Sequence, residues 1–299
     1  MFDRDPAERT VPEIPPPEES IRVVIDTDAR NEIDDQWAIA LAILSSERFT
    51  IEGFVGSNYD NDPGAGKESV EKSVREIETV LEKAGFAGQW PIKRGSHPMQ
   101  YSNEPSESEG VDFIIERALS GSEEDPLWVI GLGAGTDMAS AMLKEEAIVD
   151  RVVAFWHLRT EWPDRCTNFN VYNDVHAGRL LFHSPLPFVL FDTGTHLTCS
   201  MEESARFVEP YGEIGAYLHD IRRRYPAFMK PDKGIFDLGD IAALLEPDVA
   251  DWETVECPTV ERDLTYRFTG DLGSIVRCYD VDRDGTFELL YDKLDEYYG

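Results

Sequence analysis

Short apolar runs alternate along this chain with longer stretches in which apolar side chains recur at helical spacing. The apolar runs predict strands at residues 21–25, 49–55, 127–132, 152–156 and 187–191. The helical spacing predicts helices at residues 35–44, 68–83, 136–143 and 174–182, and a closing helix around residues 287–294. Strands that alternate with helices indicate a mainly parallel central sheet with helices on both faces. We therefore expect an α/β fold.

The folded unit is expected to be one domain over residues 21–299, with a helical and irregular segment at about 201–260. Residues 1–20 are acidic and proline-rich, and they predict a flexible leader rather than a signal peptide because they contain no apolar segment. No apolar run reaches the roughly 18 residues that a membrane span needs. The cysteines show neither metal-finger spacing nor a disulfide pattern, which indicates reduced, buried thiols in a cytoplasmic protein.

The charge balance excludes two classes of partner. The chain has 28 basic and 59 acidic residues, a formal charge of −31. Nucleic acids and anionic membranes are excluded, because clustered cations are needed to bind them. Hydrophobic residues make up 41% of the chain, enough for a sizeable core, so the charge does not indicate disorder. The acidic surface favours a halophilic protein that stays hydrated in concentrated salt; an ordinary acidic cytosolic protein is the alternative.

Five carboxylates lie within ten residues directly after the first predicted strand, at Asp26, Asp28, Glu32, Asp34 and Asp35. Like charges at this spacing repel one another unless a cation compensates them. Ligation by oxygen atoms alone suits Ca²⁺ or Mg²⁺ rather than zinc. The segment therefore predicts a metal site at the end of a strand, where ligands of parallel sheets bind. The alternative is a solvated acidic loop in which Asp34 or Asp35 caps the following helix.

This segment resembles the signature DTDPGxDD of the nucleoside hydrolase family, the inosine-uridine preferring type, although the loop here is two residues longer and lacks the Pro-Gly pair. Further segments follow in the order of the family's motifs. These are Gly56-Ser57-Asn58, Gly95 to Met99, Gly133 to Ala139 (like GPLTNxA), Asn168-Phe169-Asn170 with Asp174 (like EFNxxxDP), Asp192 to His196 (like DVTH), and Asp237 ten residues before Pro247. Each motif is short, but their shared order covers nearly the whole chain after the leader.

The resemblance implies a nucleoside hydrolase-like fold and a Ca²⁺-dependent hydrolase that cleaves the N-glycosidic bond of a ribonucleoside or related N-riboside. By the same resemblance, Asp28 is a metal ligand and the general base that deprotonates water. Asp35, Asp237 and the main-chain carbonyl of Thr136 complete the metal ligands. The family's habit implies a homo-oligomer, a dimer or a tetramer, that acts on a small nucleoside-like substrate.

The ribose contacts implied by the resemblance come from Asp34, Asn58 and Asn170. Three positions depart from the family's pattern. Asn168 stands where the family has a ribose-gripping Glu, and Trp162 stands where it has an Asn. Phe236 stands where some members have a His that protonates the leaving base.

Nucleoside specificity therefore does not follow from the resemblance. Phe236 has no proton to donate, so either another group protonates the base or a good leaving group departs while stacked on Trp162 or Phe236. His157 and His196 are candidates for that proton donor, and His196 is also an expected substrate contact; the alternative is that each is a structural hydrogen-bonding side chain.

Other readings of the same residues remain open. A phosphatase would use Asp26 and Asp28 as nucleophile and acid, but that chemistry wants its second acidic pair far downstream. A non-catalytic relative would bind a ribosylated ligand without cleaving it. The glycines at 131–135 fail the dinucleotide-binding fingerprint, because Thr136 occupies the third glycine position. The Asp280 segment starts like an EF-hand loop but has Tyr291 where the loop needs Glu.

Overall fold

The computed structural model of the protein describes residues 4–59, 68–224 and 230–299. Its centre is an eight-stranded sheet in the order β3-β2-β1-β4-β5-β6-β12-β9. All neighbouring pairs are parallel except β12 and β9. The strands are β1 (Ile21–Thr27), β2 (Phe49–Gly56), β3 (Ile92–Arg94), β4 (Leu127–Gly131), β5 (Val152–His157), β6 (Phe188–Phe191), β9 (Ala250–Glu256) and β12 (Ser274–Val281).

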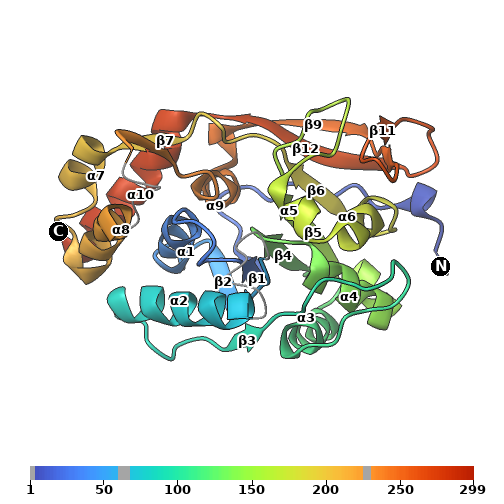
Figure 1. The fold of residues 1–299 in the computed structure, drawn as a ribbon, viewed down its shortest axis with the longest axis horizontal. Coiled ribbons are helices and arrows are strands. Elements are labelled where there is room, and N and C mark those ends of the chain that lie inside the picture. Colours follow the sequence, from blue (N-terminus) through green and yellow to red (C-terminus); the bar gives the residue numbers. More distant parts are fainter. Residues whose placement is uncertain (1–3, 60–67, 225–229) are drawn as a thin grey trace.

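The helices follow the strands closely in sequence, as the alternating pattern predicts. They are α1 (Asp35–Ile43), α2 (Ser69–Lys83), α3 (Glu109–Ser120), α4 (Thr136–Lys144), α5 (Phe169–Asn173), α6 (Val175–Phe182), α7 (Met201–Phe207), α8 (Gly212–Arg224), α9 (Leu238–Leu245) and α10 (Arg283–Tyr298). Two small antiparallel pairs complete the fold, β7 (Thr198–Ser200) with β8 (Asp232–Gly234) and β10 (Thr259–Val260) with β11 (Tyr266–Arg267). Figure 1 shows α3 to α6 gathered on one side of the strands, and α1, α2 and α7 to α10 on the other. The prediction of one α/β domain with a mainly parallel sheet is confirmed.

The sheet separates two apolar clusters, because successive side chains of a strand point to opposite faces. Along β1, Val23 and Ile25 belong to the cluster that contains residues of α1, α8, α9 and α10, whereas Val24 belongs to the cluster under α3, α4 and α6. The strand is buried on both faces, which explains why its sequence is a continuous apolar run rather than an alternating one. No helix among the described residues is long and apolar enough to cross a membrane.

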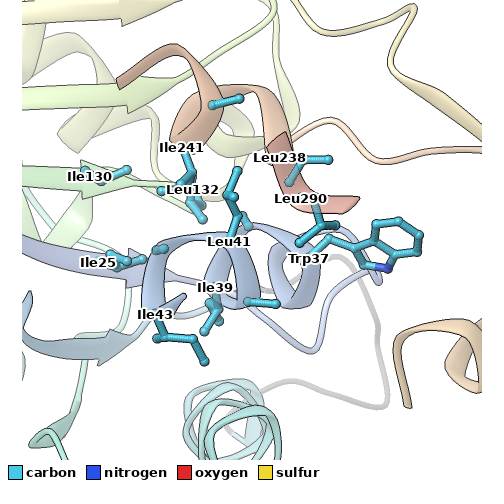
Figure 2. Packing of buried hydrophobic residues seen from close by; sticks show 14 of the residues in the cluster. Ile25, Trp37, Ile39, Leu41, Ile43, Ile130, Leu132, Leu238, Ile241 and Leu290 are labelled. Carbon is cyan, nitrogen blue, oxygen red and sulfur yellow. The ribbon is translucent and has the colours of Figure 1, made fainter. Parts of the chain in front are cut away.

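Helix α1 is surrounded by protein, since all nine of its residues are buried. Figure 2 shows Trp37 and Leu41 of α1 packed among Leu238 and Ile241 of α9 and Leu290 of α10. Fully burying one such side chain contributes about 1.5–3 kcal/mol relative to leaving it exposed. The buried helix fixes its first residue next to the end of β1, and this placement sets up the acidic loop.

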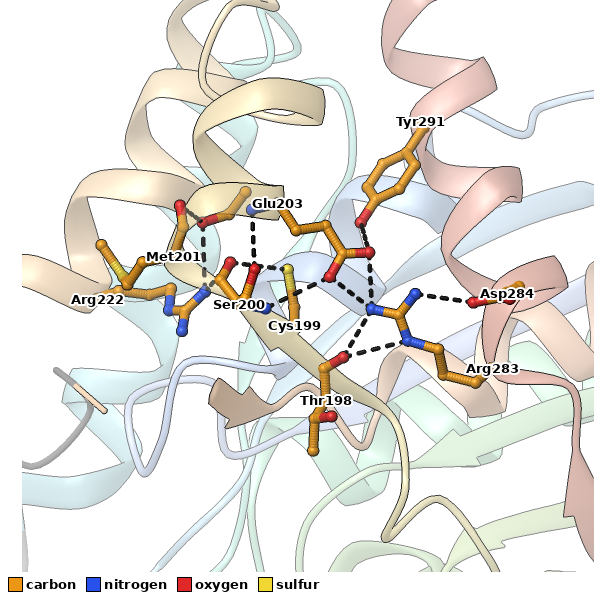
Figure 3. A network of polar contacts seen from close by, with 10 residues as sticks. Thr198, Cys199, Ser200, Met201, Glu203, Arg222, Arg283, Asp284 and Tyr291 are labelled. Carbon is orange, nitrogen blue, oxygen red and sulfur yellow. Dashed lines mark hydrogen bonds and ion pairs between the residues drawn. The ribbon is translucent and has the colours of Figure 1, made fainter. Parts of the chain in front are cut away.

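A half-buried ion-pair network holds the helices of residues 198–224 against the C-terminal helix. Arg283 donates to both carboxylate oxygens of Glu203, at 2.6 and 2.5 Å, and Tyr291 donates to the same carboxylate at 3.0 Å (Figure 3). Arg222 donates to the main-chain oxygen of Ser200 at 2.9 Å. The network joins α7, α8 and α10, and α10 also packs against α9, the helix that Asp237 directly precedes.

The acidic leader is bound to the domain by two buried arginines. Arg48 donates to the main-chain oxygens of Pro15 at 2.8 Å and Leu244 at 2.7 Å. Arg9, itself part of the leader, donates to the main-chain oxygen of Phe182 at 2.6 Å. Residues 1–3 of the leader, and residues 225–229 of the segment expected to be helical and irregular, lie outside the described residues.

Candidate active site

A cavity of about 110 Å³ opens at the carboxyl ends of the central strands. Its walls come from the loop after β1, the ends of β4 and β5, the start of α5 and the residues before α9. The lining residues are Asp28, Asn31, Glu32, Asp34, Asp35, Leu132, His157, Arg159, Asn168, Phe169, Asn170, Phe236 and Asp237. A larger hollow of about 390 Å³ lies at the opposite end of the sheet, where the leader covers the strand starts. The smaller cavity carries the chemistry, because it gathers the acidic and amide side chains.

Three buried carboxylates meet in this cavity. Oxygen atoms of Asp34, Asp35 and Asp237 all lie within 4.8 Å of one another. Asp34 ends the loop after β1, Asp35 begins α1, and Asp237 directly precedes α9. Packing of α1 against α9 therefore brings them together across about 200 residues of sequence. The main-chain N–H of Phe236 donates to Asp34 at 3.2 Å, and the hydroxyl of Thr27 donates to Asp35. Hard divalent cations prefer such a set of oxygen atoms.

The electrostatics of the cluster are those of a cation site. Burial, with the charge of Asp34 next, raises the pKa of Asp35 to about 7. Burial also raises the pKa of Asp237 well above its usual range, and the charges of Asp34 and Asp35 add to the shift. Both shifts arise because ionised carboxylates are crowded together out of water, and a bound cation would relieve them. The residues therefore fit a divalent metal.

Asp28 lines the same cavity beside this cluster. Its carboxylate accepts a hydrogen bond from the side chain of Asn31 at 3.0 Å. Burial raises the pKa of Asp28 well above its usual range, and the charges of Asp35 and Asp34 add to the shift. A carboxylate next to a cation site is placed to accept a proton from water. Asp26 is fully buried and is not among the lining residues, which argues against a phosphatase that uses it as nucleophile.

Two amide side chains, those of Asn168 and Asn170, line the cavity from the start of α5. Asn168 caps α5 by accepting from the N–H of Asn170 at 2.7 Å. The side chain of Asn170 donates to the main-chain oxygens of Leu132 at 2.7 Å and His157 at 3.0 Å, and these bonds tie α5 to the ends of β4 and β5. Phe236 lines the cavity as well, with the cations of Arg159 and Lys233 over its ring.

Four residues expected in the site lie outside the lining of this cavity. Thr136 is the first residue of α4 and donates to Asp174 at 2.8 Å, and Leu132 lines the cavity from the same loop. Asn58 accepts from Ser69 at 2.7 Å. The ring of Trp162 packs on Tyr266 and Phe268, with centroids 5.2 and 5.4 Å away, and His196 bonds the main-chain oxygen of Val281 at 2.7 Å.

The structure adds three residues that the sequence pattern did not single out as site residues. Asn31 lies inside the extended loop, Arg159 follows the end of β5, and Asp240 lies one helical turn after Asp237 and bonds His157 at 2.6 Å. Arg159 could have been predicted from its position, because it lies just after the buried strand β5, where ligands of parallel sheets bind.

Solved structures share this fold. A plant nucleoside hydrolase superposes with a TM-score of 0.73 over 92% of this chain and 99% of its own, at 16% identity. An inosine-guanosine nucleoside hydrolase gives 0.72 over 94% of this chain and 100% of its own, at 16% identity. A purine-preferring ribonucleoside hydrolase from Gardnerella vaginalis gives 0.71 over 92% of this chain and 98% of its own, at 15% identity. The architecture is that of nucleoside hydrolases.

The sequence profile described as inosine-uridine preferring nucleoside hydrolase matches residues 23–286. The chain belongs to this family, and it is an enzyme of the N-ribosyl hydrolase class. No curated protein matches the chain by sequence. The resemblance seen in the ordered motifs is confirmed at the level of the family.

Proposed function

We propose that the protein is a Ca²⁺-dependent hydrolase that cleaves the N-glycosidic bond of a ribonucleoside or related N-riboside to free base and ribose. The observation that carries the proposal is the meeting of Asp34, Asp35 and Asp237 within 4.8 Å beside Asp28, in a cavity at the carboxyl end of the sheet. Family membership supports the reaction class. The metal identity, the residue roles and the substrate are the proposed parts.

Asp28, Asp35 and Asp237 are the proposed carboxylate ligands. The main-chain oxygen of Thr136 is the fourth proposed ligand, although Leu132 is the residue of that loop that lines the cavity. Ca²⁺ is favoured over zinc because every donor is an oxygen atom. When bound, such a cation lowers the pKa of a water molecule and orients hydroxyl groups.

Asp34 accepts hydrogen bonds from the ribose hydroxyls in this proposal. Asn168 and Asn170 contact the ribose from the start of α5, where their hydrogen bonds to the main chain hold them in place. Asn58 is a further proposed ribose contact, whose hydrogen bond to Ser69 would first have to break or be shared. Holding the sugar in place reduces the entropy that must be lost on the way to the transition state.

The reaction is a displacement at the anomeric carbon. Asp28 accepts a proton from water while the water oxygen forms a bond to C1′. The bond from C1′ to the base nitrogen breaks through an oxocarbenium-like state, and its electron pair leaves with the base. Asp28 is proposed as the base because it lines the cavity next to the carboxylate cluster, where a water molecule held by the cation would lie within its reach.

Phe236 is the proposed contact of the leaving base, because an aromatic ring stacks on a flat heterocycle. Trp162 and His196 remain proposals that require a substrate reaching beyond the cavity. We also propose a homo-oligomer, a dimer or a tetramer, in the cytoplasm of a salt-adapted cell. Light scattering of the purified protein in concentrated KCl tests the oligomer.

A panel of ribonucleosides tests the proposed reaction. The protein, in concentrated salt with Ca²⁺, is incubated with each nucleoside, and ribose release is measured as reducing sugar. We expect release from at least one member of the panel, and its loss when a chelator removes Ca²⁺. No release from any member, with Ca²⁺ shown by calorimetry to be bound, would favour a relative that binds a ribosylated ligand without cleaving it.

A further inference from the structure

Arg159 is the only permanently charged cation among the residues that line the cavity, which also carries five acidic side chains. No carboxylate of the described residues lies within 4.0 Å of its guanidinium, although Asp and Glu make up 59 of the 299 residues. The guanidinium instead lies over the ring of Phe236, with 5.2 Å from its central carbon to the ring centroid. Its positive charge is therefore available to a ligand.

Arg277 is partly buried, lies outside the cavity and has acidic partners. Arg277 also lies over an aromatic ring, that of Trp162 at 4.9 Å, but it pairs with Asp192 at 2.7 Å and with Glu253 at 2.6 Å. Arg159 lines an acidic cavity but does not pair with the carboxylates of that cavity, so another contact must hold the guanidinium in place. The ring of Phe236 makes that contact, because a guanidinium stacks favourably on an aromatic face.

The position of Arg159 relative to the carboxylate cluster follows from its contact with Phe236. Phe236 directly precedes Asp237, which belongs to the carboxylate cluster, so Arg159 and Phe236 stand at the wall next to the cation site. In the proposed reaction the ribose lies at the carboxylates, and the base extends from C1′ toward this wall. Phe236 has no proton to give to the base. The departing nitrogen therefore gains negative charge next to a guanidinium.

We propose that Arg159 is a catalytic residue that stabilises the negative charge on the departing base, so that the enzyme takes ribosides whose leaving group departs as an anion. This inference rests on the proposed function and deepens it by naming the substrate class. The C1′–N bond breaks with both electrons going to the base, the water oxygen bonds to C1′, and the water proton goes to Asp28. The base anion takes a proton from solvent after release.

Aryl β-ribofuranosides test this inference, since phenols of graded acidity leave from the same sugar. The series is 4-nitrophenyl, 4-cyanophenyl and phenyl ribofuranoside, measured with wild type, Arg159→Gln and Arg159→Lys. We expect Arg159→Gln to lose little kcat on the nitrophenyl compound, and about 10²–10³-fold on the phenyl compound, as when one charge-stabilising donor is removed. Arg159→Lys, which keeps the charge, should recover part of that loss.

The matched control is Arg206→Gln. Arg206 is exposed and also lies over a phenylalanine ring, that of Phe207 at 4.7 Å, but outside the cavity. Its rates should equal wild type across the series, and Ca²⁺ affinity measured by calorimetry should be unchanged in all variants. An equal loss on every compound, or no loss in Arg159→Gln, would overturn the role of Arg159 while leaving the hydrolase standing. A wild type inactive on all three compounds would overturn the proposed function and this inference together.

Discussion

The Nδ1 atom of His157 lies 2.6 Å from a carboxylate oxygen of Asp240 and 3.4 Å from one of Asp237. Burial acts to lower the pKa of His157, but the charge and hydrogen bond of Asp240 outweigh it, and the net shift is upward. Burial raises the pKa of Asp240 to about 6, against the opposite effect of His157. The two groups thus form a buried hydrogen-bonded pair in which His157 lines the cavity, and Asp240 fixes the orientation of the ring.

Replacing Asp240 by Asn is expected to weaken catalysis without emptying the cation site. The amide keeps the shape of the carboxylate but removes the charge that holds His157, and loss of such a supporting partner costs about 10–100-fold. The measurement is kcat and KM over a pH series with saturating Ca²⁺. We expect kcat to fall and its pH profile to shift, with Ca²⁺ affinity near that of wild type. An unchanged profile would mean that His157 needs no fixed orientation.

Asp35→Asn and Asp237→Asn are expected to weaken divalent cation binding by about 10–100-fold or more, since each removes a negative charge from the cluster. Isothermal titration with Ca²⁺ measures the affinity, and the gain in Tm on adding Ca²⁺ gives a second readout. Asp271→Asn serves as the control, because Asp271 is an exposed aspartate outside the cavity. Equal affinities in all four proteins would place the cation elsewhere.

Without a divalent cation, the free energy of unfolding is expected to fall as the pH rises from about 4 to about 7. The pKa of Asp35 is about 7 in the folded protein, against an ordinary value of 3.8. Within this interval the folded carboxyl keeps its proton and the unfolded one has lost it. The folded state therefore binds more protons, and stability decreases with pH by up to about 1.4 kcal/mol per pH unit for this group.

Saturating Ca²⁺ should remove this loss, because the cation stabilises the ionised carboxylates. Urea unfolding at several pH values, with chelator and with Ca²⁺, measures both curves at fixed salt. A chelator curve that rises steadily over the same interval would show that Asp35 ionises normally in the folded protein.

Concentrated salt is expected to stabilise the protein. The formal charge of −31 makes surface acids repel one another, and the screening length falls from about 10 Å at 0.1 M salt to about 3 Å at 1 M. We expect Tm to rise by several degrees between these concentrations of KCl, measured by calorimetry with Ca²⁺ held constant. A Tm that is flat or falls with KCl would contradict a salt-adapted surface.

The central strands could be predicted from sequence because they are buried on both faces and read as continuous apolar runs. The strands β9 and β12 were not predicted. Both mix charged and apolar residues, as in Asp251 and Glu253 of β9, because this edge of the sheet is partly exposed. Their antiparallel pairing places β12 between β6 and β9, which no local pattern encodes.

The acidic lining of the cavity could be predicted, because its residues occur in the order of the family's motifs. Asp28, Asp34, Asp35 and Asp237 line one cavity, together with Asn168, Asn170 and Phe236. The order of motifs along the chain does not give distances between side chains. For this reason Trp162 and His196 were also expected to line the cavity, whereas Trp162 packs on Tyr266 and His196 bonds the main-chain oxygen of Val281. The proposed role of Arg159 could not be predicted either, because only the structure shows that its guanidinium forms no ion pair with the carboxylates of the described residues.

Ribose release by wild type and by Asp28→Asn, each with Ca²⁺ and with chelator, tests the central claim most directly. The substrate is the riboside that wild type cleaves best, circular dichroism verifies the fold, and Asp271→Asn is the control. We predict Ca²⁺-dependent release by wild type and by the control, and a loss of about 10²–10⁴-fold in kcat for Asp28→Asn. Release by a folded Asp28→Asn at the wild-type rate would contradict the account.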